Sequence, residues 1–140
     1  MKHGKVRRAA VGSAVLAAAA ATVVTAPGPA YAAGYNGACG AGYRVIDSLP
    51  LDATEDGGTV YLTYNRTNGY NCVVTVRNTP GDPIWMSASI KPSGTEDYHS
   101  EQNLFTTYAG PVYLHAPGRC IDWDGSIGYA YNWQLNSHCG

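Results

Sequence analysis

Short runs of alternating apolar and polar residues, separated by Gly, Pro and Asn clusters, follow the first 33 residues of the chain. In residues 59–65 (TVYLTYN), Val60 and Leu62 alternate with threonine and tyrosine, and residues 70–77 (YNCVVTVR) repeat this two-residue period. Between them lies Asn68-Gly69, a pair that readily adopts the positive φ angles of a tight turn. A period of two favours β-strands over helices, so the pattern predicts a β-hairpin.

The same alternation predicts the remaining strands. Residues 92–103 are polar and are predicted to form a loop. Further strands are expected at residues 43–48, 84–91, 104–108, 112–116 and 120–123, with an alternating row at 129–134. No capped stretch in this part has the spacing of an amphipathic helix. The predicted fold is all-β, either a small disulfide-stapled β-sandwich or a closed barrel of about seven or eight strands.

The first 32 residues have the composition of a secretory signal peptide. Four basic residues precede an apolar, Ala-rich run at residues 9–26, and Ala30-Tyr31-Ala32 supplies a cleavage site. A membrane anchor is the alternative, but an anchor needs about 20 strongly apolar residues and this run is mostly alanine. We therefore predict a signal peptide at residues 1–32 and a single all-β domain at residues 33–140, which implies export.

Removal of the signal peptide changes the charge of the protein. The full chain has 9 Lys and Arg and 10 Asp and Glu, for a net charge of −1. Four of the basic residues lie in the signal peptide, so 5 basic residues remain against all 10 acidic ones, and the net charge becomes −5. An acidic protein without a Lys/Arg cluster is a poor match for nucleic acid or for an anionic membrane. We predict neither partner, and no membrane insertion after signal cleavage.

Four cysteines remain after the signal peptide: Cys39, Cys72, Cys120 and Cys139. An even number in an exported chain indicates disulfides, and no Cys-x-x-Cys or Cys–His spacing suggests zinc. Four cysteines allow three connectivities, which sequence cannot separate. We favour Cys39–Cys72 and Cys120–Cys139, because each pair would close one supersecondary unit.

Catalytic and metal-binding patterns are weak. The candidates for a triad are His99, His115 and His138, but none of the serines lies in a G-x-S-x-G turn. Asp122 and Asp124 would share one strand face and could act as paired carboxylates in glycoside hydrolysis. The sequence from Asp122 onward starts like an acidic calcium-binding loop, but it lacks the remaining ligand positions and the terminal Glu of such a loop. We predict no catalytic residues, no metal site and no cofactor.

Aromatic residues are the stronger functional signal. The chain has 11 Tyr, 3 Trp and 1 Phe, and these residues suit sugar stacking and protein interfaces as well as cores. Tyr129, Tyr131 and Trp133 alternate with smaller or polar residues, so all three would share one strand face, either a core face or an exposed binding platform. We favour the core face. Three other aromatic residues fall within strand patterns and are expected to be packed: Tyr64, Trp85 and Tyr113.

Four sequence blocks resemble one known family. They are YNGACG at residues 35–40, GTVYLTYN at 58–65, GYNCVVTVRNT at 69–79 and TYAGPVYLHAPGRCIDW at 107–123. Together with the four cysteines in order, they are similar to the spore-associated protein A family, which comprises small exported proteins of spore-forming actinomycetes such as streptomycetes. The resemblance extends from residue 35 to the C-terminus.

What the resemblance implies is a location on the spore or cell surface, without a defined catalytic activity. We therefore predict a secreted, non-catalytic surface protein with a structural or protective role and surface components, polysaccharide or protein, as partners. One alternative is a secreted inhibitor of a protease or glycosidase that would use the loops at residues 66–69 and 92–103. Another is a cell-wall or carbohydrate binding module that would use Tyr129, Tyr131 and Trp133.

Overall fold

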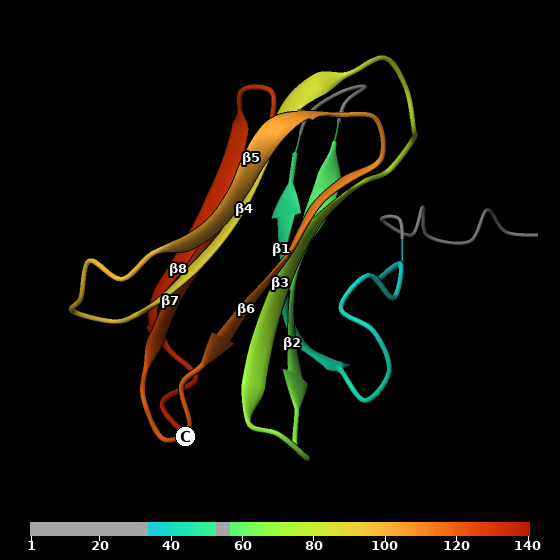
Figure 1. Cartoon of the computed structure of the whole chain (residues 1–140). Coiled ribbons are helices and arrows are strands. Elements are labelled where there is room, and N and C mark those ends of the chain that lie inside the picture. Colours follow the sequence, from blue (N-terminus) through green and yellow to red (C-terminus); the bar gives the residue numbers. More distant parts are fainter. Residues whose placement is uncertain (1–33, 53–56) are drawn as a thin grey trace, which may run out of the picture.

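Eight β-strands form the protein in the computed structural model, which describes residues 34–52 and 57–140 (Figure 1). The predicted signal peptide lies outside the described residues. The strands are β1 (Arg44–Leu51), β2 (Gly58–Asn65), β3 (Tyr70–Arg77), β4 (Ile84–Pro92), β5 (His99–Phe105), β6 (Tyr108–His115), β7 (Ile121–Ile127) and β8 (Ala130–Ser137). Within the described ranges there is no helix, and therefore none long and apolar enough to cross a membrane.

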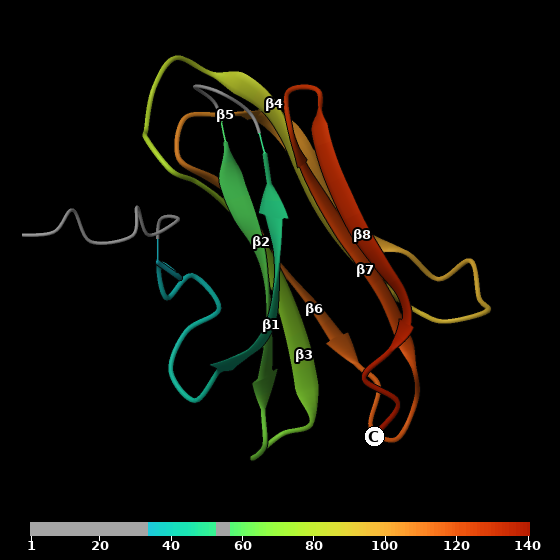
Figure 2. The same ribbon diagram turned by 180° about the vertical axis from the view of Figure 1, so that it is seen from behind.

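The strands belong to two separate antiparallel sheets. Sheet A has the order β1-β2-β3-β6 and sheet B the order β5-β4-β7-β8. Figure 2 shows the two sheets face to face as two layers, not closed into one barrel. The all-β prediction is confirmed, and of the two predicted architectures the sandwich fits.

The space between the sheets is filled by the apolar side of each alternating strand. Val60 and Leu62 of β2 meet Met86 and Ile90 of β4, and Trp123 of β7 is the largest side chain in this core. Burial of such side chains contributes about 25 cal/mol per Å² of apolar surface. The alternation in the sequence places Val60 and Leu62 on one face of β2, and that face is the one that lies in the core.

The outer face of sheet A is also covered. Residues 34–43 lie against it as an irregular segment with turns, seen beside β1 and β2 and away from sheet B in Figure 1. Tyr61, Val74 and Val76 pack there in a second apolar cluster. The Tyr113 hydroxyl donates a hydrogen bond to the carbonyl of Cys39 at 3.1 Å. The two central strands of sheet A are therefore covered on both faces, which is why nearly every residue of β2 and β3 is buried.

Two disulfides hold these parts together. Cys39–Cys72 links the covering segment to β3, and Cys120–Cys139 links the residue before β7 to the chain end after β8. This is the connectivity that the sequence led us to favour.

Both edges of the sandwich are tied by side chains. At one edge, the chain passes from β5 in sheet B to β6 in sheet A, and the Gly110 amide donates to Glu101 Oε2 at 2.6 Å. At the other edge, Asn132 Nδ2 on β8 donates to the Pro50 carbonyl on β1 at 2.8 Å. These contacts fix the two layers relative to each other.

The prediction of a loop at residues 92–103 is wrong in its second half. Residues 99–105 form β5, which pairs with β4 from Ile84↔Phe105 to Ile90↔His99. Nearly all of this strand is exposed because it is an edge strand, so its sequence (HSEQNLF) has no buried side to mark it. The predicted strand at residues 104–108 is consequently divided between the end of β5 and the start of β6.

Candidate functional site

The outer face of sheet B is open except at one end, where residues 93–98 contact Lys91 and Asp122. On β4, Met86, Ala88 and Ile90 point into the core, so the residues between them point outward. The cross-strand partners of these outward residues lie on the same face. The outer face of sheet B thus consists chiefly of Trp85, Ser87, Ser89 and Lys91 on β4, Asp122, Asp124 and Ser126 on β7, and Tyr131 and Trp133 on β8.

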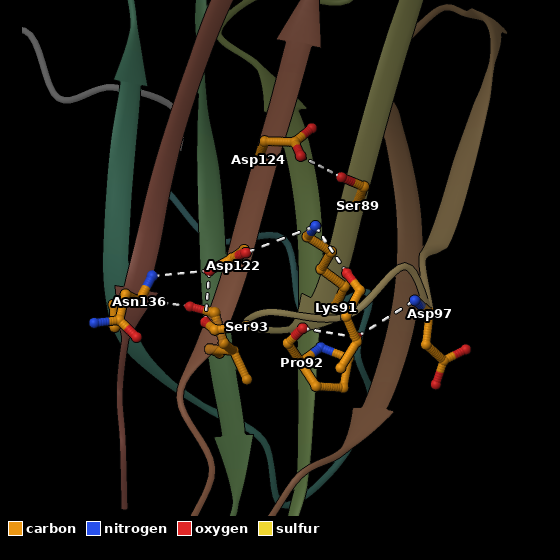
Figure 3. A network of polar contacts seen from close by, with 11 residues as sticks. Ser89, Lys91, Pro92, Ser93, Asp97, Asp122, Asp124 and Asn136 are labelled. Atoms are coloured by element: carbon orange, nitrogen blue, oxygen red, sulfur yellow. Dashed lines mark hydrogen bonds and ion pairs between the residues drawn. The ribbon is translucent and has the colours of Figure 1, made fainter.

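A ladder of polar contacts occupies the middle of this face. The hydroxyls of Ser87 and Ser126 lie 2.7 Å apart. One residue pair further along, Ser89 Oγ donates to Asp124 Oδ2 at 2.5 Å (Figure 3). These contacts join β4 to β7 through their outward side chains, and they hold the polar groups in fixed positions.

Asp122 is held by several partners. It accepts hydrogen bonds at Oδ1 from Ser93 Oγ at 2.5 Å and from the Asn136 amide at 2.8 Å, while Lys91 Nζ lies 3.8 Å from Oδ2 (Figure 3). Burial by itself raises the pKa of Asp122. The two hydrogen bonds and the charge of Lys91 outweigh it, so the pKa lies below its usual value. Asp122 is an ionised group that fastens the ends of β4, β7 and β8 together.

Asp124 has a different environment. Burial raises the pKa of this carboxyl group, and the hydrogen bond from Ser89 and the more distant charge of Lys91 only partly offset the effect. Among the described residues, only its Oδ2 makes a hydrogen bond, so Oδ1 can accept one from a ligand. Asp124 is therefore the carboxyl group on this face that remains free to take part in binding.

Aromatic side chains surround the polar ladder. The rings of Tyr131 and Trp133 stack with centroids 5.3 Å apart and an interplanar angle of 21°, and each side chain is 54% exposed. Trp85 is 50% exposed at another corner of the face. Lys91 lies over the ring of Tyr98, 4.4 Å from its centroid. The result is a polar centre with aromatic groups around it.

The structure changes our expectation for the row at residues 129–134. Tyr131 and Trp133 face outward instead of into the core, because Ala130 packs inward and Asn132 reaches across to β1. Tyr129 does not belong to the row; it lies fully exposed in the turn before β8. Strand alternation places side chains on one face but does not say which face a second layer covers.

Trp85 was also expected to be packed, and this expectation is wrong. It has the same parity as Ser87 and Ser89, opposite to the buried Met86 and Ala88. The polar residues on that side of β4 were the signal that could have identified Trp85 as outward-facing. The other two aromatic residues expected to be packed, Tyr64 and Tyr113, are partly exposed, and the Tyr113 ring contacts that of Tyr43 at 5.6 Å.

The candidate catalytic histidines have separate partners. His138 Nε2 lies 3.0 Å from Asp47 Oδ2, His99 Nε2 lies 3.8 Å from Asp97 Oδ1, and the His115 ring packs against Tyr70. Within the described part of the chain, none of the three is hydrogen-bonded to a serine, and no group of three His, Cys, Asp or Glu residues could hold a metal ion. The structure does not bring the sequence candidates together as a triad.

A hollow of about 220 Å³ lies at one end of the sandwich, apart from sheet B's outer face. Its lining combines Ile46 of β1 with Pro117, Gly118, His138 and Gly140 near the chain end. His138 is already paired with Asp47. Ile46, Pro117, Gly118 and Gly140 have no ionisable side chain. The outer face of sheet B offers more hydrogen-bonding and stacking groups, and we take it as the candidate site.

Fold and face together define a small disulfide-linked β-sandwich with one open sheet face that bears aromatic side chains. The chain is 45% identical to Spore-associated protein A of Streptomyces coelicolor over 135 residues, which cover 91% of this chain and 84% of that protein. The chain therefore belongs to the spore-associated protein A family, as its sequence blocks indicate. No protein-family model matches the chain, and no solved structure matches it.

Proposed function

We propose that this chain is an exported, non-catalytic component of the spore or cell surface with a structural or protective role, attached through the outer face of sheet B. The relative from Streptomyces coelicolor is a spore-associated protein, and paired cysteines are typical of oxidising, extracellular compartments. The observation that carries the proposal is the open face itself. Its aromatic groups Trp85, Tyr131 and Trp133 are each about half exposed, and the sheet that bears them is held by a packed core and by the Cys120–Cys139 disulfide.

Glycoside hydrolysis is the catalytic alternative that one observation favours. Two carboxyl groups whose pKa values shift in opposite directions are typical of an acid and base pair, and Asp122 and Asp124 are such a pair. However, Asp122 is already bound by Ser93, Asn136 and Lys91. A glycosidase needs both carboxyl groups at the scissile bond, and Asp124 alone cannot fill the two roles.

Inhibition of a hydrolase rests on the turn between β2 and β3. Asn65 Oδ1 accepts from the Thr67 amide and Asn68 Oδ1 accepts from the Tyr70 amide, so the exposed tip is held in one conformation. A preorganised loop of this kind suits a protease inhibitor. Sub-micromolar inhibition within a panel of proteases and amylases would favour this function over the one proposed.

Fractionation of sporulating cultures tests the proposal. We expect the wild-type protein on washed spores, and we expect the Trp85→Ala/Tyr131→Ala/Trp133→Ala triple variant mainly in the medium. Tyr129→Ala is the matched control, because Tyr129 is exposed beside β8 but off the face. Wild-type protein found only in free medium would contradict surface association, and equal retention of the triple variant would contradict attachment through this face.

A further inference from the structure

The outer face of sheet B has its hydrogen-bonding groups and its aromatic groups in a definite order. Two neighbouring cross-strand rows form its centre. One row contains Gln102, Ser87, Ser126 and Tyr131, and the next contains Ser100, Ser89, Asp124 and Trp133. Each row therefore runs from an edge strand with small polar side chains, across hydroxyl and carboxyl groups, to an aromatic ring on β8.

Further apolar groups lie beyond these two rows along the strand direction. Trp85 lies two residues from Ser87 along β4, opposite Leu104 of β5. Strand spacing and rise place the Cα atoms of Trp85 and Tyr131 about 12 Å apart, on either side of the end of the polar centre formed by Ser87 and Ser126. The Tyr98 ring lies at the other end of the face, under Lys91. Aromatic rings thus stand on several sides of a centre that is polar.

This arrangement, with polar groups at the centre and aromatic groups at the periphery, is the reverse of that in a typical protein–protein interface. Protein partners bury an apolar centre within a polar rim, and their most important anchors sit near the middle. Here the middle consists of Ser87, Ser89, Asp124 and Ser126. A ligand that fits must hydrogen-bond at the centre and stack at the periphery. Sugar rings do both, because they present C–H groups on their faces and hydroxyls at their edges.

Charge narrows the class of polymer. Lys91 is the lysine on this face, and it lies 3.8 Å from Asp122 and over the Tyr98 ring, so its charge is already compensated. An anionic polymer would also meet the Asp124 carboxyl group and a protein whose net charge without residues 1–32 is −5. Burial raises the pKa of Tyr131, and the negative charge of Asp124 adds to this, so the Tyr131 hydroxyl is a neutral hydrogen-bond donor. These features suit an uncharged polyhydroxylated chain.

We propose that the outer face of sheet B binds a neutral β-linked polysaccharide, with Trp85, Tyr131 and Trp133 stacking on sugar rings and Asp124, Ser87 and Ser126 bonding to sugar hydroxyls. A β-linked chain of this class is an extended ribbon, and it can lie along an open sheet face better than a coiled polymer can. Asp124 accepts through Oδ1, while Ser89 keeps Oδ2 in place. This inference rests on the proposed function, for which it names the surface component that the face recognises.

Co-sedimentation with insoluble polysaccharides tests the inference. The full-length chain is expressed in an actinomycete host, purified with its disulfides intact, and mixed with microcrystalline cellulose or chitin. We expect binding that is insensitive to salt, because neutral ligands release no counterions. We expect Trp133→Ala, Tyr131→Ala and Trp85→Ala each to lower the association constant by about two- to ten-fold. Tyr129→Ala should bind like the wild type.

Asp124→Asn separates binding from hydrolysis. The amide oxygen can still accept a hydrogen bond but carries no charge, so we expect Asp124→Asn to weaken binding by about two- to ten-fold without abolishing it. We expect no release of reducing sugar by the wild type. If the wild type releases reducing sugar and Asp124→Asn abolishes this release, the face is an active site and the binding proposal is overturned. As a control, we expect each variant to have the same thermal unfolding midpoint as the wild type, which would show that the exposed substitutions leave the fold intact.

The inference and the proposed function fail in different ways. No binding to cellulose or chitin, or equal binding by the Trp85→Ala/Tyr131→Ala/Trp133→Ala variant, overturns the polysaccharide ligand. Binding only to an anionic polymer such as alginate, lost in high salt, overturns it as well. Spore retention that still depends on the three aromatic residues would then leave the attachment face standing with a different ligand.

Discussion

The outer faces of the two sheets differ in how their side chains avoid unfavourable exposure to water. On sheet A, Tyr61, Val74 and Val76 form an apolar surface, and residues 34–43 cover it. On sheet B, Ser87, Ser89 and Asp124 satisfy one another or remain able to bind water, and the face stays open. An apolar sheet face requires a cover, whereas a face with a hydrogen-bonded centre does not. Of the two outer faces, that of sheet B is therefore the one accessible to a partner.

Loss of the covering segment should have the largest effect on this comparison. The Cys39→Ala/Cys72→Ala variant loses a crosslink with a sequence separation of 33, which is worth about 3–4 kcal/mol by chain entropy. The variant also frees the segment that packs on Tyr61 and Val74. We expect a larger loss of unfolding free energy than for Cys120→Ala/Cys139→Ala, whose separation of 19 gives about 3 kcal/mol. Urea unfolding measures both, and equal losses would mean that the cover contributes no packing energy.

Single truncations to alanine on the two outer faces should lower the unfolding free energy by different amounts. The smaller side chain, on sheet A, should cost more than the larger one, on sheet B. Val74→Ala removes fully buried methyl groups from sheet A and should lower the unfolding free energy by about 2 kcal/mol. Trp133→Ala removes a much larger, half-exposed side chain from sheet B and should change it by less than about 1 kcal/mol. The same urea titration compares them. A Trp133 variant that unfolds as easily as the Val74 variant would show that sheet B's outer face is a packing surface.

The two carboxyl groups on sheet B should give small effects of opposite sign. The pKa of folded Asp122 is lowered, so its ionised form stabilises the fold at neutral pH, and this contribution is lost as the pH falls through the folded-state pKa. The pKa of folded Asp124 is raised, so the fold favours its protonated form, and that contribution is lost as the pH rises through the raised pKa.

We therefore expect Asp122→Asn to destabilise the protein at neutral pH, with an effect that disappears in acid. Asp124→Asn should not destabilise it at neutral pH, because the amide resembles the protonated carboxyl group. Urea unfolding at a series of pH values measures both variants. Destabilisation by both substitutions to the same extent at neutral pH would contradict the different environments of the two groups.

Strand positions were the most predictable part of the fold. Residues 59–65 and 70–77 have strong alternation and a clear Asn-Gly turn, and they correspond closely to β2 and β3. β5 was missed because an edge strand with both sides exposed needs no apolar period. The candidate site was harder still. The alternation of Tyr131 and Trp133 is the same whether they face a core or solvent, and for Trp85 only the polar neighbours Ser87 and Ser89 on its side of β4 distinguish the two cases.

The sequence by itself determined that this chain forms short alternating strands and has the motifs of the spore-associated protein A family, because strand period and turn residues act locally. The number and order of the cysteines also indicated two disulfides and favoured the pairs Cys39–Cys72 and Cys120–Cys139. Only the tertiary structure decided which strands share a sheet and which faces are covered. β3 pairs with β6 and β4 with β7 across long stretches of chain. The position of residues 34–43 on sheet A leaves sheet B's aromatic face open, and that choice depends on packing between distant segments, which no local pattern records.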